Sequence, residues 1–148
     1  MTNVTRRTAI ALTGAAATSL GLAACSAAGG SSSNAGSGGG VQATKDASGK
    51  LAVESSKVPV GGSVIVSTNT GSDPAVAIAQ PKAGEFVAHT AVCTHQGCLV
   101  AAAGAQLDCP CHGSKFDAFT GKVINGPAQL PLDAVKIAVN GTSLEITL

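Results

Sequence analysis

The chain has 148 residues and a formal net charge of +1 at neutral pH. That length suits one domain and is short for two, and a charge so close to zero offers no basic surface for nucleic acid. There is no Trp or Tyr and only three Phe, so a core must be built from aliphatic side chains. The cysteine count is five, an odd number, so one cysteine should have a role of its own.

Residues 1–24 have the composition of an export signal. Arg6 and Arg7 precede a mildly apolar run over residues 9–24 that is interrupted by Thr, Ser and Gly. The run is too short and too weakly apolar for a membrane span, which needs about 20 apolar residues. We therefore predict an export signal. The arginine pair followed by "TAIAL" resembles a twin-arginine signal, and an ordinary secretion signal is the alternative.

Residues 25–44 follow as a predicted tether. The sequence "LAAC" at residues 22–25 resembles a bacterial lipobox, in which cleavage leaves the cysteine as a lipid-modified N-terminus. Residues 26–40 are only Ser, Ala, Gly and Asn, a composition that cannot bury a core. We expect Cys25 to carry a lipid that anchors the protein on the extracytoplasmic face of a bacterial cell membrane. The alternative is a stray cysteine beside an ordinary cleavage site.

From about Lys45 to the end, the pattern is that of strands. Short runs rich in β-branched residues alternate with turn sequences, and no stretch has a sustained helical period. Asn140-Gly141 lies between two apolar runs and predicts a hairpin at the C-terminus. The sequence therefore predicts an all-β domain over residues 45–148. The expected strands cover residues 63–68, 75–80, 85–90, 98–103, 134–140 and 143–148.

Two short stretches, expected in loops between strands, gather most of the metal-binding side chains. They are "CTHQGC" at residues 93–98 and "CPCHGS" at residues 109–114. A zinc site of two Cys and two His would leave Cys98 and Cys111 without a role, and its first half lacks the usual Cys spacing. Two disulfides would instead leave both histidines unexplained. The residues alone leave these alternatives open.

These stretches resemble the cluster-binding loops of Rieske iron–sulfur proteins, in which Cys-Thr-His-x-Gly-Cys is followed by Cys-Pro-Cys-His-Gly-Ser. Every fixed position is present, and the resemblance extends over about residues 45–148. It implies a Rieske-like antiparallel β-sandwich with a small cluster-binding subdomain of two loops, which holds one [2Fe–2S] cluster. By the same resemblance, Cys93 and Cys109 would bind one iron, and His95 and His112 the other.

The resemblance also implies roles for the remaining motif residues. Cys98 and Cys111 would form a disulfide between the loops, which requires an oxidising compartment. With two thiolate ligands, one disulfide and a lipid on Cys25, all the cysteines are then assigned. The hydroxyl of Ser114 would donate a hydrogen bond to a bridging sulfide.

Three further positions lie outside the ligand set. Phe116 stands where high-potential members of the family usually have Tyr, whose hydroxyl donates to a ligating thiolate, and we therefore expect a lower potential here. Gly126-Pro127 resembles the proline-containing loop that covers the cluster. His89 lies outside both motifs, and we interpret it as a structural histidine near a strand end.

The predicted function is that of an exported, membrane-tethered one-electron carrier. Replacing two thiolates by neutral imidazoles raises the potential of such a cluster. A Rieske-type oxygenase would need a second iron held by two His and a carboxylate. This chain has three histidines, of which the cluster takes two, so we see no independent catalytic site.

The expected partners are redox proteins, either a cytochrome or a quinol-oxidising complex. One alternative to a separate carrier is the iron–sulfur subunit of a quinol–cytochrome c reductase of the bc type. Against it, Gln96 stands where those subunits usually have an apolar residue at the docking tip, and the N-terminal run is too short for their membrane helix. A zinc-stabilised surface lipoprotein is the alternative outside electron transfer.

Overall fold

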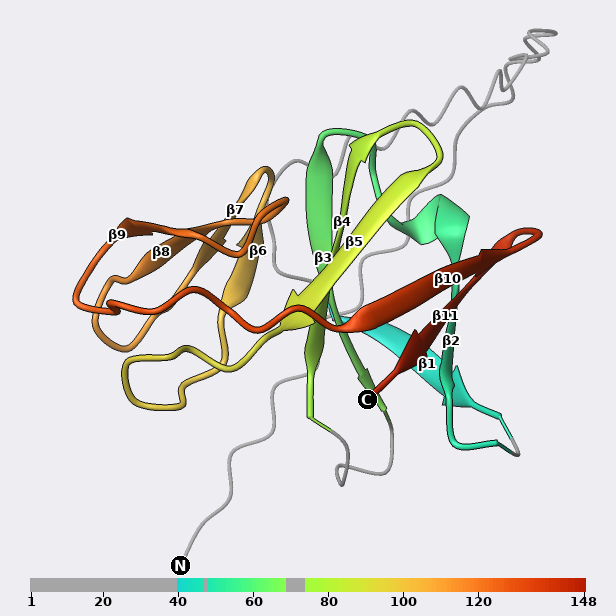
Figure 1. Ribbon diagram of the computed structural model, residues 1–148, viewed down its shortest axis with the longest axis horizontal. Coiled ribbons are helices and arrows are strands. Elements are labelled where there is room, and N and C mark those ends of the chain that lie inside the picture. Colours follow the sequence, from blue (N-terminus) through green and yellow to red (C-terminus); the bar gives the residue numbers. More distant parts are fainter. Residues whose placement is uncertain (1–39, 47, 69–73) are drawn as a thin grey trace, which may run out of the picture. The chain divides into compact units, whose positions relative to one another are not determined.

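The computed structural model describes residues 40–46, 48–68 and 74–148 (Figure 1). They form an all-β unit, as predicted, with one 3₁₀ turn and no α-helix in these ranges. The elements are β1 (Val41–Lys45), β2 (Leu51–Glu54), η1 (Ser55–Lys57), β3 (Gly62–Thr68), β4 (Val76–Lys82), β5 (Glu85–Thr90), β6 (Ala101–Ala103), β7 (Gln106–Asp108), β8 (Lys115–Asp117), β9 (Val123–Asn125), β10 (Lys136–Asn140) and β11 (Ser143–Thr147). The predicted export signal and Cys25 lie outside the described residues.

The larger sheet has seven strands in the order β10-β11-β2-β1-β3-β4-β5. Strand β1 joins its two halves, because residues 41–43 pair with β3 while Thr44 and Lys45 pair with β2. The β1–β3 pairing is parallel, whereas the other neighbours in this sheet are antiparallel. The predicted antiparallel sandwich therefore has the right class, with one parallel pair that the sequence pattern did not indicate.

Strand β4 divides the interior into two cores. Its side chains alternate between faces, as in any strand. Val76 and Ile78 are buried on one face, with residues from β2, β3 and β11. The alanines 75, 77 and 79 face a second core, which contains the two buried free cysteines. Fully burying a Val or Ile contributes about 1.5–3 kcal/mol. The larger residues thus stabilise the main sheet, and the alanines leave room for the second core.

The smaller sheet is antiparallel, in the order β6-β7-β8-β9, and packs through β6 and β7 against β3. The hydroxyl of Ser63 on β3 donates to the carbonyl of Gly104 in the β6–β7 turn, at 2.7 Å. Figure 1 shows β6–β9 on one side of the central strands β3–β5, with β10, β11 and β2 on the other. The smaller sheet and its loops form the predicted cluster-binding subdomain, which we call the loop subdomain (residues 91–132).

Most predicted strands are confirmed, and two boundaries differ from the prediction. Residues 63–68, 75–80, 85–90, 134–140 and 143–148 all overlap strands, and the hairpin at Asn140-Gly141 joins β10 to β11. The expected strand over 98–103 shrinks to β6, preceded by a single bridge between Val92 and Leu99. Residues 41–44, assigned above to the tether, belong to β1, because their backbone pairs with two neighbouring strands. The folded sheet therefore begins at Val41 and not at Lys45.

In the part of the chain that the structure describes, no helix has the length and apolar character needed to cross a membrane.

Candidate metal centre

The first Cys/His loop, residues 93–98, connects β5 to β6 and is closed by its own backbone. The N–H of Cys93 donates to the carbonyl of Cys98 at 2.7 Å, and the N–H of Gly97 donates to the carbonyl of Cys93 at 2.9 Å. Gly97 has a φ of 75°, a left-handed conformation that other residues rarely adopt. The loop therefore returns on itself and presents its side chains from a tight turn.

The second loop, residues 109–114, connects β7 to β8 and repeats this hydrogen-bond pattern. The N–H of Cys109 donates to the carbonyl of Ser114 at 2.8 Å, and the N–H of Gly113 donates to the carbonyl of Cys109 at 3.1 Å. Gly113 also has a φ of 75°. The two loops therefore have the same backbone hydrogen bonds although their sequences differ. In each, the first cysteine both donates to the last residue and accepts from the glycine.

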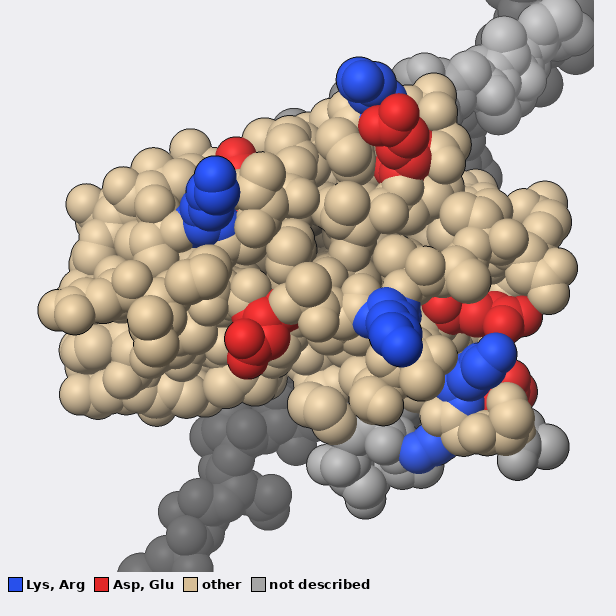
Figure 2. All heavy atoms as spheres, in the orientation of Figure 1, with Lys and Arg blue, Asp and Glu red and all other residues tan. Residues whose placement is uncertain are grey.

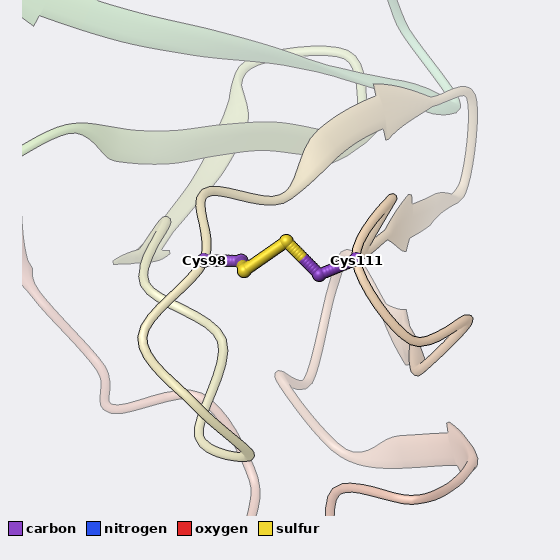
Figure 3. The surroundings of a disulfide bond; sticks show 2 residues. All are labelled: Cys98 and Cys111. Atoms are coloured by element: carbon purple, nitrogen blue, oxygen red, sulfur yellow. A yellow bond between two sulfur atoms is a disulfide. The ribbon is translucent and has the colours of Figure 1, made fainter.

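A disulfide joins the two loops. Cys98 and Cys111 are bonded, with their Cα atoms 6.5 Å apart, so the predicted pairing is confirmed (Figure 3). Cys111 is exposed and Cys98 is half-buried. In the described residues the free cysteines are Cys93 and Cys109. The bridge therefore leaves one thiol in each loop for other chemistry.

The four predicted ligands form two chemically different pairs. Cys93 and Cys109 are only 2% and 3% exposed and belong to one core cluster. His95 is half-buried and His112 is exposed, and their rings meet edge to face with centroids 4.8 Å apart. The Nδ1 atom of His95 is buried and has no hydrogen-bond partner in the protein.

This donor set fits a cluster in which one iron takes two thiolates and the other takes two imidazoles. A buried imidazole nitrogen without a partner is costly unless something else binds it. The structure therefore offers two free thiols on the core side, two adjacent imidazoles nearer the surface, and one nitrogen that lacks a partner.

The sulfur atoms of Cys98, Cys109 and Cys111 form a tighter group, all within 4.8 Å of one another. Two of these sulfurs are used in the disulfide, so the group cannot supply three thiolates to one metal ion. The predicted ligands need not form such a group, because each iron would take only two of them. This arrangement disfavours the alternative of two disulfides, since Cys93 and Cys109 remain free.

A third loop, residues 125–130, is tied to both Cys/His loops. Asn125 donates its side-chain amide to the carbonyl of Gly113 at 3.2 Å. The hydroxyl of Thr94 donates to the carbonyl of Leu130 at 2.7 Å. This loop contains the Gly126-Pro127 segment. The hydrogen bonds that Thr94 and Asn125 make with it and with the second loop were not predicted. Thr94 could have been identified from the sequence, since it is a fixed position of the Cys-Thr-His motif.

Ser114 and Phe116 are both fully buried at the base of the second loop, with 0% exposure. The Ser114 hydroxyl oxygen accepts a hydrogen bond from the N–H of Ala128 in the third loop at 3.0 Å. No described residue accepts the proton of this hydroxyl, which remains available to another acceptor. Phe116 lies on β8 in the same core cluster as Cys93 and Cys109.

His89 lies near the end of β5, as predicted. It is 6% exposed, and neither ring nitrogen has a hydrogen-bond partner. Burial lowers the pKa of His89 below its ordinary value of 6.5, and the smaller influences of the Phe119 backbone and the Asp117 carboxylate oppose the shift. Its backbone pairs with Ala134, and a Cβ atom at Gly121 would lie 2.8 Å from its Nδ1, so the ring packs against the loop subdomain.

The three loops themselves carry no charged side chain, and a partly exposed ion pair between Asp108 and Lys115 flanks the second loop. Residues 93–98, 109–114 and 124–132 contain no Asp, Glu, Lys or Arg. On the face shown in Figure 2, the charged side chains lie away from the left-hand end, where these loops lie in Figure 1. Leu99 is 55% exposed and Leu130 is 66% exposed, while Gln96, three residues before Leu99, is an exposed polar residue. This end of the loop subdomain is suited to contact with a neutral or apolar surface.

Comparison with known proteins gives one family. Residues 50–137 match the Rieske [2Fe-2S] domain family. The chain is 42% identical over 96 residues to the cytochrome b6-f complex iron–sulfur subunit of Chlorobaculum thiosulfatiphilum, a match that covers 64% of this chain and 50% of that protein. It is 41% identical over 112 residues to the subunit of the same name in Synechococcus elongatus, covering 72% of this chain and 62% of that protein. The chain thus spans about half to three-fifths of the length of these relatives.

Among solved structures, a ferredoxin of Sphingomonas yanoikuyae B1 has a similar fold. The TM-score is 0.51 at 26% sequence identity, over 64% of this chain and 93% of that one. A protein named as a ferredoxin is thus covered over almost its whole length. The relatives named as cytochrome b6-f subunits are covered only in part.

Proposed function

This chain belongs to the Rieske [2Fe–2S] domain family, its cofactor is one [2Fe–2S] cluster, and we propose that it transfers single electrons with Cys93, Cys109, His95 and His112 as the ligands. The observation that carries the ligand assignment is the His95–His112 pair. Two imidazoles meet at 4.8 Å between ring centroids, and one of them has a buried nitrogen without a partner. Buried nitrogens without a partner also occur at His89, so it is the pairing of two imidazoles, one in each loop, that supports the assignment.

The surroundings give each part of the chain a defined role in such a site. When bound, the cluster supplies a centre that accepts and releases one electron. Cys93 and Cys109 hold the core side and exclude water, because both are almost completely buried. His112 is exposed and lies beside the uncharged tip, so the imidazole edge gives a redox partner the closest approach. Ser114 has a free hydroxyl proton at the buried side, where it can donate to a developing negative charge.

The test of the ligand assignment is the visible and EPR spectrum of the dithionite-reduced protein. His95→Ala and His112→Ala should abolish the visible bands and the EPR signal of the reduced protein while leaving most strands formed. Gln96→Ala is the matched control, because Gln96 is exposed in the same loop and should leave both spectra unchanged. A coloured, unchanged His95→Ala protein would contradict the assignment. A colourless wild type containing zinc would instead support a zinc-stabilised lipoprotein.

We further propose that the partner is a quinol-oxidising cytochrome complex. Two observations support this choice: the similarity to iron–sulfur subunits of cytochrome b6-f complexes and the uncharged tip with exposed Leu99 and Leu130. A separate carrier is the second candidate, favoured by the exposed polar Gln96 and by the similarity to a protein named as a ferredoxin. Both candidates use the same tip, and they differ in whether a cytochrome b must be present.

Stopped-flow reduction by a quinol, with and without a solubilised cytochrome b complex from the source organism, distinguishes them. The proposal predicts rapid reduction only with the complex, slowed at least tenfold by Leu130→Asp, because burying that carboxylate at an apolar contact is costly. Val139→Asp is the control, since Val139 is 56% exposed on β10 in the larger sheet. Equal rates with and without the complex would support a separate carrier.

We propose that the protein is exported and anchored at the membrane through a lipid on Cys25. The support is the "LAAC" motif, the Arg6-Arg7 pair and the low-complexity tract after the cysteine. Cys25→Ser should release the protein from the membrane fraction without changing its colour. Retention of that variant after a high-salt wash would require another attachment.

A further inference from the structure

A free thiol lies beside the disulfide in the loop subdomain. The sulfur of Cys109 is within 4.8 Å of both sulfurs of the Cys98–Cys111 bond. Cys93, the other free cysteine, is outside this group of three. A free thiol near a disulfide is the reactant pair for thiol–disulfide exchange, in which a thiolate attacks one sulfur and releases the other. The structure therefore places a nucleophile and an electrophile next to each other in one site.

We propose that, when no cluster is bound, Cys109 attacks the sulfur of Cys98 and changes the disulfide from Cys98–Cys111 to Cys98–Cys109. Cys109 supplies the electron pair of the new S–S bond, and the proton that it gives up ends on the departing Cys111 sulfur. The old bond breaks, and Cys111 leaves as a thiolate that takes up a proton. Atoms and electrons balance within these three residues, and no external oxidant or reductant takes part.

The direction of attack follows from the chain around the three sulfurs. Attack on Cys111 would join Cys109 to a residue only two positions away, across Pro110, whose ring fixes the backbone. Attack on Cys98 instead keeps a bridge between the two loops. It also releases Cys111, which is exposed, so the leaving thiolate is solvated. The sulfurs must approach from up to 4.8 Å to about 2.05 Å, and residues 110–113 next to Cys109 are exposed, so no core packing has to be broken there.

The exchange would couple disulfide connectivity to cluster occupancy. This part rests on the proposed function, because only a Cys109 bound to iron is unable to attack. In the cluster-bound protein the disulfide should then persist as Cys98–Cys111. In the cluster-free protein the exchange places Cys109 in a disulfide, so one of the two proposed thiolate ligands is no longer free. Reloading would then require a reductant that reopens the new bond.

The experiment maps the free thiols over time. The cluster of the full-length protein is removed anaerobically with an iron chelator, and the protein is incubated without added thiol or oxidant. Samples are quenched in acid, denatured and alkylated. Cleavage before Asp108 separates the two loops, and fragmentation in the mass spectrometer separates Cys109 from Cys111. The proposal predicts that the label moves from Cys109 to Cys111 over minutes to hours in most molecules, while Cys93 stays labelled throughout.

Two variants that both lack a proposed ligand provide the matched pair. Cys93→Ser keeps all three sulfurs and should exchange as the stripped wild type does. Cys109→Ser has no attacking sulfur and should keep the Cys98–Cys111 bond indefinitely. A label that remains on Cys109 in both the stripped wild type and Cys93→Ser overturns the proposal.

The same assay separates the exchange from the ligand assignment. If the label also moves to Cys111 in the intact coloured protein, exchange occurs but iron does not protect Cys109, which overturns the coupling and the role of Cys109 as a ligand. If the label moves only after iron is removed, both the exchange and the coupling are supported.

Discussion

Ser114 and Phe116 lie two positions apart at the base of the second loop, are equally buried, and differ in what they can donate. The Ser114 hydroxyl accepts from the Ala128 N–H and keeps its own proton free. Phe116 has no donor. A hydrogen bond to a thiolate or sulfide stabilises the reduced, more negative state more than the oxidised one. These two side chains should therefore set the reduction potential in opposite senses.

Phe116→Tyr should raise the reduction potential by some tens of millivolts. The added hydroxyl enters the core cluster that holds Cys93 and Cys109, where a ligating thiolate can accept its proton. A differential of about 1 kcal/mol corresponds to roughly 40 mV for a one-electron couple. Protein-film voltammetry measures the shift. An unchanged or lower potential in a folded, coloured variant would mean that this ring points away from the ligands.

Ser114→Ala should lower the potential and also destabilise the loop subdomain. The Ala128 N–H loses its acceptor, and leaving a buried donor unpaired costs about 1–3 kcal/mol. The control is Ser63→Ala, which removes another buried serine hydroxyl, the one bonded to Gly104. Voltammetry and denaturant unfolding should show a loss of stability in both variants and a change of potential in Ser114→Ala alone. A similar change of potential in both would remove the special role of Ser114.

At the scale of elements, the disulfide holds two loops that are otherwise tied mainly to their own strands. It closes a ring over a sequence separation of 13, worth on the order of 3 kcal/mol in the chain-entropy model. Replacing both Cys98 and Cys111 by Ser should leave a cluster that forms but is lost at a lower temperature. The visible absorbance during heating reports the loss. A variant as heat-stable as the wild type would show that the third loop alone holds the site.

His89 and Gly121 make the junction between β5 and the loop subdomain dependent on pH. A Cβ atom at Gly121 would lie 2.8 Å from the His89 Nδ1, so the ring fills the space that glycine leaves. Because burial lowers the pKa of His89, the unfolded chain binds a proton more readily than the folded chain between the folded pKa and about 6.5. The resulting stability is present above pH 6.5 and is lost as the pH falls toward the folded pKa.

The free energy of unfolding should accordingly fall between pH 7 and pH 5, by at most about 1.4 kcal/mol per pH unit for this one proton. His89→Gln should show a shallower dependence, since it lacks the titrating ring. Denaturant unfolding of both cluster-free proteins at a series of pH values checks this difference. Equal slopes in the two proteins would exclude His89 as the cause.

Strands were predicted correctly where the run of strand-forming residues was long. They were missed where a short segment is extended only because it pairs with adjacent strands. "EFVAHT" is a six-residue run that contains Phe, Val and Thr, and it forms β5 with the expected bounds. The three-residue strands β7, β8 and β9 were not predicted, because a run that short has no period and is extended only through its pairing. Strand β1 was assigned to the tether for a similar reason, since it depends on β2 and β3 for its hydrogen bonds.

The candidate site was more accessible from sequence than the sheet was. The ligands and the disulfide partners were assigned through the resemblance of two short motifs to the Rieske pattern, since the residues alone left a zinc site and two disulfides open. What the motifs could not supply is the third loop, because Asn125 and Leu130 reach the site only after β8 and β9 turn the chain back. The proximity of Cys109 to the disulfide also depends on this tertiary arrangement.

At the scale of the whole molecule, the fold separates two tasks. The larger sheet supplies a core of Val, Ile and Leu that does not involve the ligands. The second core contains the two free cysteines and Phe116, in the loop subdomain with the uncharged tip. This division allows the loop subdomain to hold a redox centre close to the surface while the larger sheet packs a separate core of its own.

The most direct test of the central claim is pulsed EPR of the dithionite-reduced protein labelled with ¹⁵N at histidine. The account predicts strong hyperfine coupling to two imidazole nitrogens, from His95 and His112, since only directly bound nitrogens couple strongly and His89 lies outside the ligand set. Coupling to one nitrogen, or to none, would contradict the cluster assignment on which the proposed function rests.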